Sequence, residues 1–127
     1  MSVKLLEKPN APEVLTKAVL RVAEKLDISQ AMLAKVLGVS PLTISSLYSG
    51  DYRLDECRKE WEFALLFVQV FNSLDSIVGS EMTACAWLKS ENKGLNGRPI
   101  DLIGQIDGLA RVADYLGGHE VLSSRSL

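Results

Sequence analysis

The chain has 127 residues, the length of a single domain, and this excludes a large multidomain enzyme. Fourteen Lys and Arg against 16 Asp and Glu give a net charge of -2, so no overall basic field attracts nucleic acid or anionic lipid. The apolar share, 47%, is high for a small domain and indicates surface that a partner covers.

The sequence also limits the compartment and the chemistry. The longest apolar run, residues 63–68, is far shorter than the roughly 18 residues needed to cross a bilayer. Charges at Lys4 and Glu7 are unlike a secretory signal, so we expect a cytoplasmic protein that does not enter a membrane. Cys57, Cys85 and a single histidine cannot assemble a four-ligand zinc site, and a glycine-rich phosphate loop is absent. The sequence therefore predicts no metal, no cofactor, no small-molecule substrate and no catalysis.

Apolar residues recur at three- and four-residue spacing along the chain, and no stretch alternates as a strand does, so the predicted fold class is all-α. A first helix is expected near residues 11–27. A second, over 30–37, should end at Gly38, because glycine readily adopts the left-handed backbone of a tight turn. Ser40 then caps a third helix, 41–49, which begins with proline and stops at a glycine.

A long helix is predicted to start at Asp55 or Glu56 and to end at Val78, just before a glycine. Residues 63–68 are apolar on every side of this helix, and a helix of that kind is usually buried on every side. Self-association is the simplest way to bury them, so a homodimer is predicted. Its predicted contacts are Phe63, Leu66, Phe67, Val70 and Phe71.

Three shorter helices should follow. Ser80 caps the first, and a polar loop, 89–98, separates it from helices near 100–106 and 107–116. A glycine pair is expected to break the last helix and to leave a flexible C-terminal tail, 117–127.

Residues 29–49 have the length and punctuation of a helix-turn-helix. Small Ala34 suits a close helix crossing, and the turn glycine follows four residues later. The predicted core of the motif is Leu33, Leu37, Val39, Ile44 and Leu47. The run Ser29-Gln30-Ala31-Met32-Leu33-Ala34-Lys35-Val36-Leu37-Gly38-Val39-Ser40 resembles the Xre-type, repressor-like helix-turn-helix domains.

This resemblance implies that the third helix reads operator DNA. The candidate DNA-binding residues are Gln30, Lys35, Ser40, Leu42, Thr43, Ser45, Ser46, Ser49 and Arg53. Short hydroxyl side chains accept or donate to several bases, and the helix offers neither Arg for guanine nor Asn or Gln for adenine, so modest specificity and two protomers are expected. The alternative is that the two helices are a packing unit without DNA binding, with the serines present as caps.

From Trp61 onward the chain is similar to the toxin-binding domain of the Xre/MbcA/ParS antitoxins. The residues that carry the similarity are 64–75, Ala86-Trp87-Leu88 and 95–103. Asn96 replaces a glycine that is usual in this family, and asparagine tolerates left-handed backbone nearly as well. The resulting domains are a DNA-binding region, residues 1–54, a toxin-binding and dimerisation region, 55–116, and the tail.

Together the two resemblances imply the antitoxin of a type II toxin-antitoxin system, which neutralises a RES-domain toxin that consumes NAD and represses its own operon. A stand-alone dimeric transcriptional regulator is the alternative. The candidate toxin-binding residues are Trp87, Asn92, Arg98, Tyr115, His119, Arg125, Ser126 and Leu127. Aromatic side chains are favoured anchors at interfaces, although each can equally fill the core. The resemblance implies that the tail enters the NAD cleft of the toxin, and an ordinary frayed terminus is the other interpretation.

Overall fold

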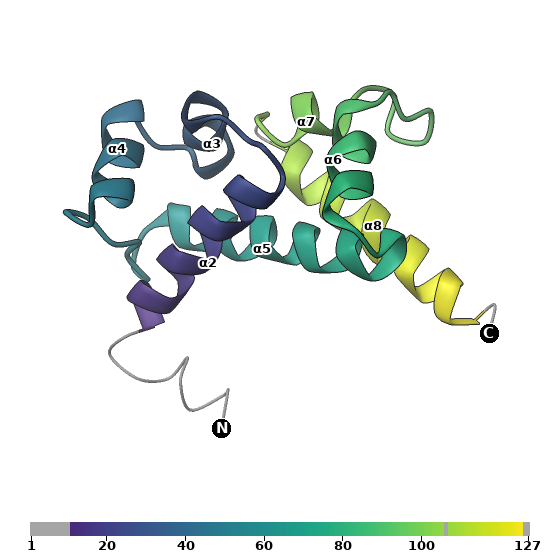
Figure 1. The fold of residues 1–127 in the computed structure, drawn as a ribbon, viewed down its shortest axis with the longest axis horizontal. Coiled ribbons are helices and arrows are strands. Elements are labelled where there is room, and N and C mark those ends of the chain that lie inside the picture. Colours follow the sequence, from purple (N-terminus) through teal and green to yellow (C-terminus); the bar gives the residue numbers. More distant parts are fainter. Residues whose placement is uncertain (1–10, 106, 126–127) are drawn as a thin grey trace.

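The computed structural model describes the backbone of residues 11–105 and 107–125, and the side chains of residues 11–105 and 107–117. This part of the chain is all-α, as predicted, with seven helices and no strand (Figure 1). The helices are α2 (Ala11–Lys25), α3 (Gln30–Leu37), α4 (Pro41–Ser49), α5 (Lys59–Val78), α6 (Glu81–Lys89), α7 (Pro99–Leu102) and α8 (Gly108–Arg125).

The N-terminal helices begin and end at the predicted capping residues. Ser29 and Ser40 each accept a hydrogen bond on the side-chain oxygen from the backbone N–H three residues on, at 3.1 and 3.2 Å. Gly38 and Gly50 end α3 and α4 with φ angles of 71° and 87°, which glycine adopts without steric conflict. The first helix ends two residues earlier than predicted, because Asp27 itself takes a left-handed backbone, with φ 54°.

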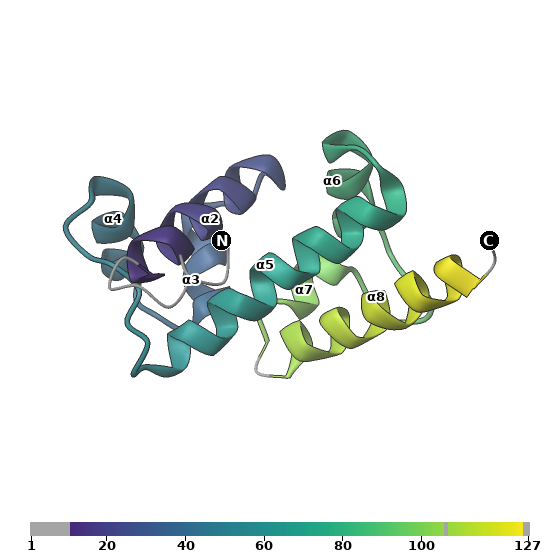
Figure 2. The same ribbon diagram turned by 90° about the horizontal axis from the view of Figure 1, so that it is seen from below.

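The long helix α5 crosses the middle of the molecule. Figure 1 shows α2, α3 and α4 gathered at its N-terminal end and α6, α7 and α8 at the other, and Figure 2 shows α8 lying alongside it. The helix starts at Lys59, later than the predicted Asp55 or Glu56. Asp55 instead caps an isolated turn, where its carboxylate accepts a hydrogen bond from the Cys57 backbone N–H at 2.9 Å.

The apolar face of α5 is covered largely by helices of the same chain. Phe67 and Val70 are 0% exposed and Phe71 is 9% exposed, so the prediction that these three residues make dimer contacts is wrong. The physical reason is that α2, α3, α6 and α8 of the same chain pack on this side of α5. Leu65, in the same apolar run, is still 47% exposed. Phe63 and Leu66 are half-buried.

Among the described residues, α5 is the one single helix that is long and apolar enough to cross a membrane, judged by length and composition alone. Taken together as one bent segment, α3 and α4 also reach that length and apolar content. The core helix of a water-soluble protein has the same hydropathy. Phe67 and Leu74 of α5 are fully buried among the other helices, while Leu65 and Ile77 of the same helix are exposed.

The C-terminal half departs from the sequence prediction at its last helix. Instead of stopping at the glycine pair, α8 continues to Arg125, so the predicted break and the tail starting at residue 117 are wrong. Gly117 does not take the left-handed backbone that ends a helix, and glycine inside a helix costs only about 1 kcal/mol relative to alanine. The helix after the polar loop is shorter than predicted and ends at Leu102. Asn96 has φ 60°, the left-handed backbone expected of it.

Candidate functional site

Helices α3 and α4 have the geometry of a helix-turn-helix. The chain direction changes by 108° between them, within the range typical of this motif. Leu33, Leu37, Ile44 and Leu47 are at most 2% exposed and hold the two helices at this angle, while Val39 is half-buried. The predicted core of the motif is therefore confirmed.

The predicted DNA-binding residues of this unit differ in how far they reach the surface. Gln30, Ser40, Leu42, Ser45 and Ser49 are exposed, whereas Thr43 and Ser46 are half-buried. Two of the hydroxyl groups also serve the fold, since Ser40 caps α4 and Ser49 donates a hydrogen bond to the Asp51 carboxylate at 2.9 Å. Leu42, at 77% exposure, and Ser45 are the clearest outward-facing positions of α4.

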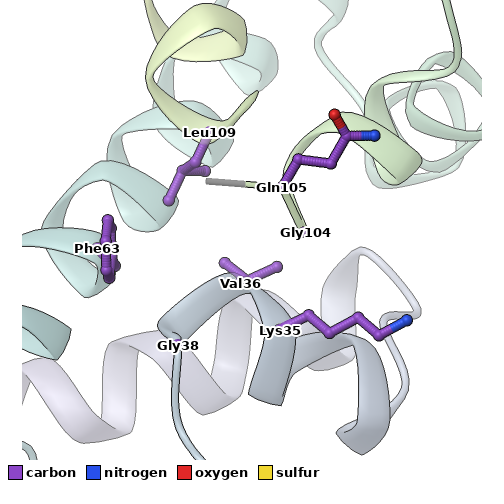
Figure 3. Close-up of a pocket in the computed structure, with 7 residues that line it drawn as sticks. All are labelled: Lys35, Val36, Gly38, Phe63, Gly104, Gln105 and Leu109. Atoms are coloured by element: carbon purple, nitrogen blue, oxygen red, sulfur yellow. The ribbon is translucent and has the colours of Figure 1, made fainter. Parts of the chain in front are cut away.

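The two predicted cations lie on the flanks of the motif rather than on α4. The stem of Lys35 faces the connection between α7 and α8, where a Cβ on Gly104 would lie 3.4 Å from the Lys35 Cβ (Figure 3). The guanidinium of Arg53 lies 4.0 Å from the carboxylate of Glu13, in a groove beside α2. The groove that Arg53 lines also includes Tyr48 and Gly50, at the C-terminal end of α4.

A small cavity separates α3 from the C-terminal helices (Figure 3). Its volume is about 130 Å³, and it is lined by Lys35, Val36, Gly38, Phe63, Gly104, Gln105 and Leu109. It holds no arrangement of nucleophile, base and acid. Within the described residues, no three His, Cys, Asp or Glu side chains are placed to hold a metal ion.

Two predicted toxin-binding aromatics lie against each other. Trp87 of α6 and Tyr115 of α8 are stacked, with ring centroids 6.4 Å apart and planes 25° apart, and both are half-buried. Gly94 of the polar loop also contacts the tyrosine, since a Cβ there would lie 2.7 Å from Tyr115 Cε1. Stacked aromatic rings in partial contact with solvent offer an apolar platform to a partner. We call Trp87, Gly94 and Tyr115 the aromatic platform.

The loop that carries Gly94 is held in one shape. Asn92 and Gly97 exchange two backbone hydrogen bonds, at 2.9 and 3.2 Å, and the Asn92 side-chain oxygen accepts a hydrogen bond from the Leu95 N–H at 3.1 Å. Arg111 of α8 donates to the Leu95 carbonyl at 3.0 Å. Asn92 therefore serves the loop itself. Gly94 and Arg111 were not among the predicted site residues. The sequence contains a hint for Gly94 alone, because it is a glycine inside a polar loop.

The remaining predicted toxin-binding residues are less available. Arg98 donates from Nε and from a terminal nitrogen to the two oxygens of Asp101, at 2.9 and 3.2 Å, so its charge is already paired within the chain. The backbone of His119 and Arg125 belongs to α8, and their side chains lie outside the described set. The predicted residues Ser126 and Leu127 lie outside the described residues.

Fold and surface together define a helix-turn-helix protein with a second helical module that carries an aromatic platform. Residues 6–69 match the antitoxin Xre-like helix-turn-helix domain, and residues 73–120 match the antitoxin Xre/MbcA/ParS C-terminal toxin-binding domain. The chain belongs to the Xre/MbcA/ParS antitoxin family, as both resemblances in the sequence indicated. None of the curated proteins matches it. The aromatic platform and Arg98 lie within the range of the toxin-binding domain.

Proposed function

We propose that this antitoxin neutralises a RES-domain toxin that consumes NAD, and that it represses its own operon through α3 and α4. It does so as a cytoplasmic homodimer without catalytic activity of its own. The observation that supports this most is the stack of Trp87 on Tyr115 inside the range that matches the toxin-binding domain. The assignment of the toxin to the RES class and of operator DNA as the second partner rests on the family resemblance.

The aromatic platform suits a protein partner for an energetic reason. Two half-buried rings that already pack on one another lose little conformational freedom when a partner covers them. The hydrogen bonds around Asn92 hold the neighbouring loop in place before binding. A buried aromatic anchor contributes about 2 kcal/mol or more at an interface. Loss of Trp87 should therefore weaken toxin binding by about thirtyfold.

Co-expression with the neighbouring reading frame tests the neutralisation. The chain should co-purify with that product, and its presence should stop NAD loss in an activity assay. Trp87→Ala should restore NAD consumption at antitoxin concentrations that otherwise suppress it. Met82→Ala is the matched control, since Met82 lies on the same helix, is 84% exposed and is outside the stack. Equal inhibition by both variants would exclude the platform as the toxin contact.

The C-terminal end of α8 is proposed to enter the NAD cleft of the toxin. Because the backbone stays helical to Arg125, residues 117–125 extend about 12 Å, and not the greater length of an extended tail. Deletion of residues 119–127 should weaken inhibition of NAD loss while the complex persists. Full inhibition by the shortened chain would contradict this part of the proposal.

DNA binding is proposed for the outward face of α4. The double change Leu42→Glu and Ser45→Glu places two carboxylates at exposed positions, where they should repel phosphates and lower affinity for a fragment of the chain's own promoter. Ser76→Glu combined with Met82→Glu adds the same charge at exposed positions of the C-terminal half and is the control. If the α4 variant binds the promoter as tightly as the control variant does, the packing-unit interpretation is favoured.

A stand-alone dimeric transcriptional regulator is the second candidate. It is favoured by the helix-turn-helix geometry alone, with the 108° change of direction between α3 and α4. The two candidates differ in one result. Promoter binding without any co-purifying product of a neighbouring frame would support the regulator.

A further inference from the structure

A groove lies between α2 and the C-terminal end of α4. Its volume is about 290 Å³. The charged side chains that line it are Glu13 and Lys17 of α2 and Arg53 of the segment after α4, and Tyr48 is among the other lining residues. We call it the α2–α4 groove.

The carboxylate of Glu13 lies between the two cations of the groove. One of its oxygens is 3.2 Å from Lys17 Nζ, and the other is 4.0 Å from a terminal nitrogen of Arg53. The second contact is longer than a hydrogen bond, so the guanidinium keeps donors available. The side chains of Lys17 and Arg53 are 73% and 62% exposed, so an anion from outside can reach both. The groove is therefore arranged as a site for an anion with at least two oxygens.

This anion site lies next to the face of α4 that is proposed to contact DNA. Tyr48 is three residues beyond Ser45, about one helical turn further along the exposed side of α4. In a helix-turn-helix complex the second helix lies in the major groove with its N-terminal residues on the base edges, and the sugar-phosphate backbones form the borders of that groove. The C-terminal end of α4 therefore approaches a DNA backbone, and the α2–α4 groove with it.

We propose that the α2–α4 groove binds a phosphate of the DNA backbone between Lys17 and Arg53, and that Glu13 occupies this anion site until DNA displaces it. This inference rests on the proposed function, which supplies the DNA binding. Carboxylate and phosphate compete because both accept charge-assisted hydrogen bonds from the same two cations. Glu13 lowers the affinity for DNA of any sequence, because a phosphate contact carries no sequence information.

A salt titration of DNA binding tests the cations. Each phosphate contact steepens the dependence of log affinity on log salt by nearly one. Arg53→Gln should reduce this slope by about one for each bound protomer, so a fourfold rise in salt should weaken its binding about threefold less per protomer. The promoter fragment and an unrelated duplex of the same length should respond alike. An unchanged slope in Arg53→Gln would overturn the proposal.

Arg98→Gln is the matched control for the salt titration. It also removes one exposed arginine charge, but Arg98 is paired with Asp101 at 2.9 Å in the C-terminal half of the chain. The slope of this variant should equal that of the unmodified chain. If the unmodified chain binds neither duplex, the DNA-binding part of the proposed function fails, and this inference fails with it. If it binds DNA and the slope is the same in both variants, only the groove is wrong.

The substitution Glu13→Gln tests the competing carboxylate. It keeps the length of the side chain and removes its charge, so both duplexes should bind about two- to fivefold more tightly, the range expected for exposed ion pairs. Glu24→Gln is the matched control, because Glu24 is exposed on the same helix and forms no ion pair with the described residues. Its gain should be smaller. Equal gains in the two variants would contradict the role of Glu13.

A background without the two cations separates competition from general repulsion between Glu13 and DNA. In the double variant Lys17→Gln and Arg53→Gln, the further change Glu13→Gln should give no larger gain than Glu24→Gln, because no ion pair remains to be broken. If the gain is as large as in the chain that keeps both cations, Glu13 only repels DNA and the proposal is wrong. All four side chains are at least partly exposed, so the variants should fold, which far-UV circular dichroism checks.

The Arg53 side chain also gives a direct readout. Its Nε–H signal in ¹⁵N NMR should shift when the promoter duplex is added, whereas the Arg98 signal should stay in place, because Arg98 Nε already donates to Asp101. Inorganic phosphate, at the same concentration of phosphate groups and the same ionic strength, tests a free anion as the occupant. A shift of Arg53 with inorganic phosphate as large as with the duplex would overturn the assignment to DNA.

Discussion

Replacing Gly94 by alanine should disturb the aromatic platform and little else. A Cβ at this position would lie 2.7 Å from Tyr115 Cε1, 3.0 Å from the Tyr115 hydroxyl oxygen and 3.2 Å from Asn92 Oδ1. Carbon atoms in contact are normally about 3.5–4.0 Å apart, so the tyrosine ring must retreat by about 1 Å. Gly94 does not use the left-handed backbone, so alanine fits the main chain itself.

The expected loss of stability follows from the small displacement of a packed ring. Forcing an extra methyl group into a packed site costs about 1–3 kcal/mol. For a chain of this length, each kcal/mol lowers the Tm by about 3–5 °C, so Gly94→Ala should lower it by about 3–15 °C. The ring that retreats is the one on which Trp87 stacks, so we also expect toxin affinity to fall about tenfold.

A neighbouring glycine provides the control. Gly97 lies in the same loop, and a Cβ there would meet no atom within 4 Å, so Gly97→Ala should change the Tm by less than about 2 °C. Thermal unfolding followed by far-UV circular dichroism gives the Tm, near-UV circular dichroism reports the stacked rings, and calorimetric titration gives toxin affinity. In a Tyr115→Ala background the Gly94 substitution should lower the Tm much less, because only the 3.2 Å approach to Asn92 Oδ1 remains. If Gly94→Ala matches Gly97→Ala in all three measurements, the steric reasoning is wrong.

Three further predictions concern stability. Thr16→Val should lower the free energy of unfolding by about 1–3 kcal/mol in urea titrations, because the buried Leu54 N–H donates to the Thr16 hydroxyl at 2.9 Å. Thr16→Ser keeps the hydroxyl and should retain most of this stability. Gly117→Ala should raise stability by about 0.5–1 kcal/mol, because α8 runs through this position with open space around it; an unchanged unfolding midpoint would contradict a continuous helix. Burial and the 2.7 Å hydrogen bond to Glu60 raise the pKa of Tyr52 from 10.0 to about 12. The folded state therefore holds the Tyr52 proton more tightly, and its contribution to stability is complete below pH 10 and lost as the pH rises through about 12. Urea unfolding between pH 9 and 12 should show this decline, and Tyr52→Phe should flatten it.

Local chemistry explains why most helix ends were predictable from the sequence. Ser29, Ser40 and Ser80 each accept a hydrogen bond from a backbone N–H three residues on, and Gly38 and Gly79 take the left-handed backbone that ends a helix. These interactions involve residues within a few positions of one another, so the sequence alone contains them.

Packing between distant segments was not predictable in the same way. The apolar circumference of α5 indicated buried surface correctly, but not that α2, α3, α6 and α8 of the same chain supply the cover around Phe67 and Val70. The same limit applies to Lys35, whose place against Gly104 is set by the meeting of two halves that are remote in sequence. Trp87 and Tyr115 were each predicted as partner-binding residues, while their stacking depends on how α6 and α8 meet.

The position of α5 argues against treating the two halves as separate folding units. The family match to the helix-turn-helix domain ends at residue 69 and the match to the toxin-binding domain starts at residue 73, so both boundaries fall inside this one helix. Ala64 and Leu74, on either side of that junction, are both fully buried in a single continuous core. A continuous α-helix transmits displacement along its axis, because every turn is bonded to the next. The predicted division at residues 54 and 55 assigns all of α5 to the second domain, whereas in the fold the helix is the structural support of both.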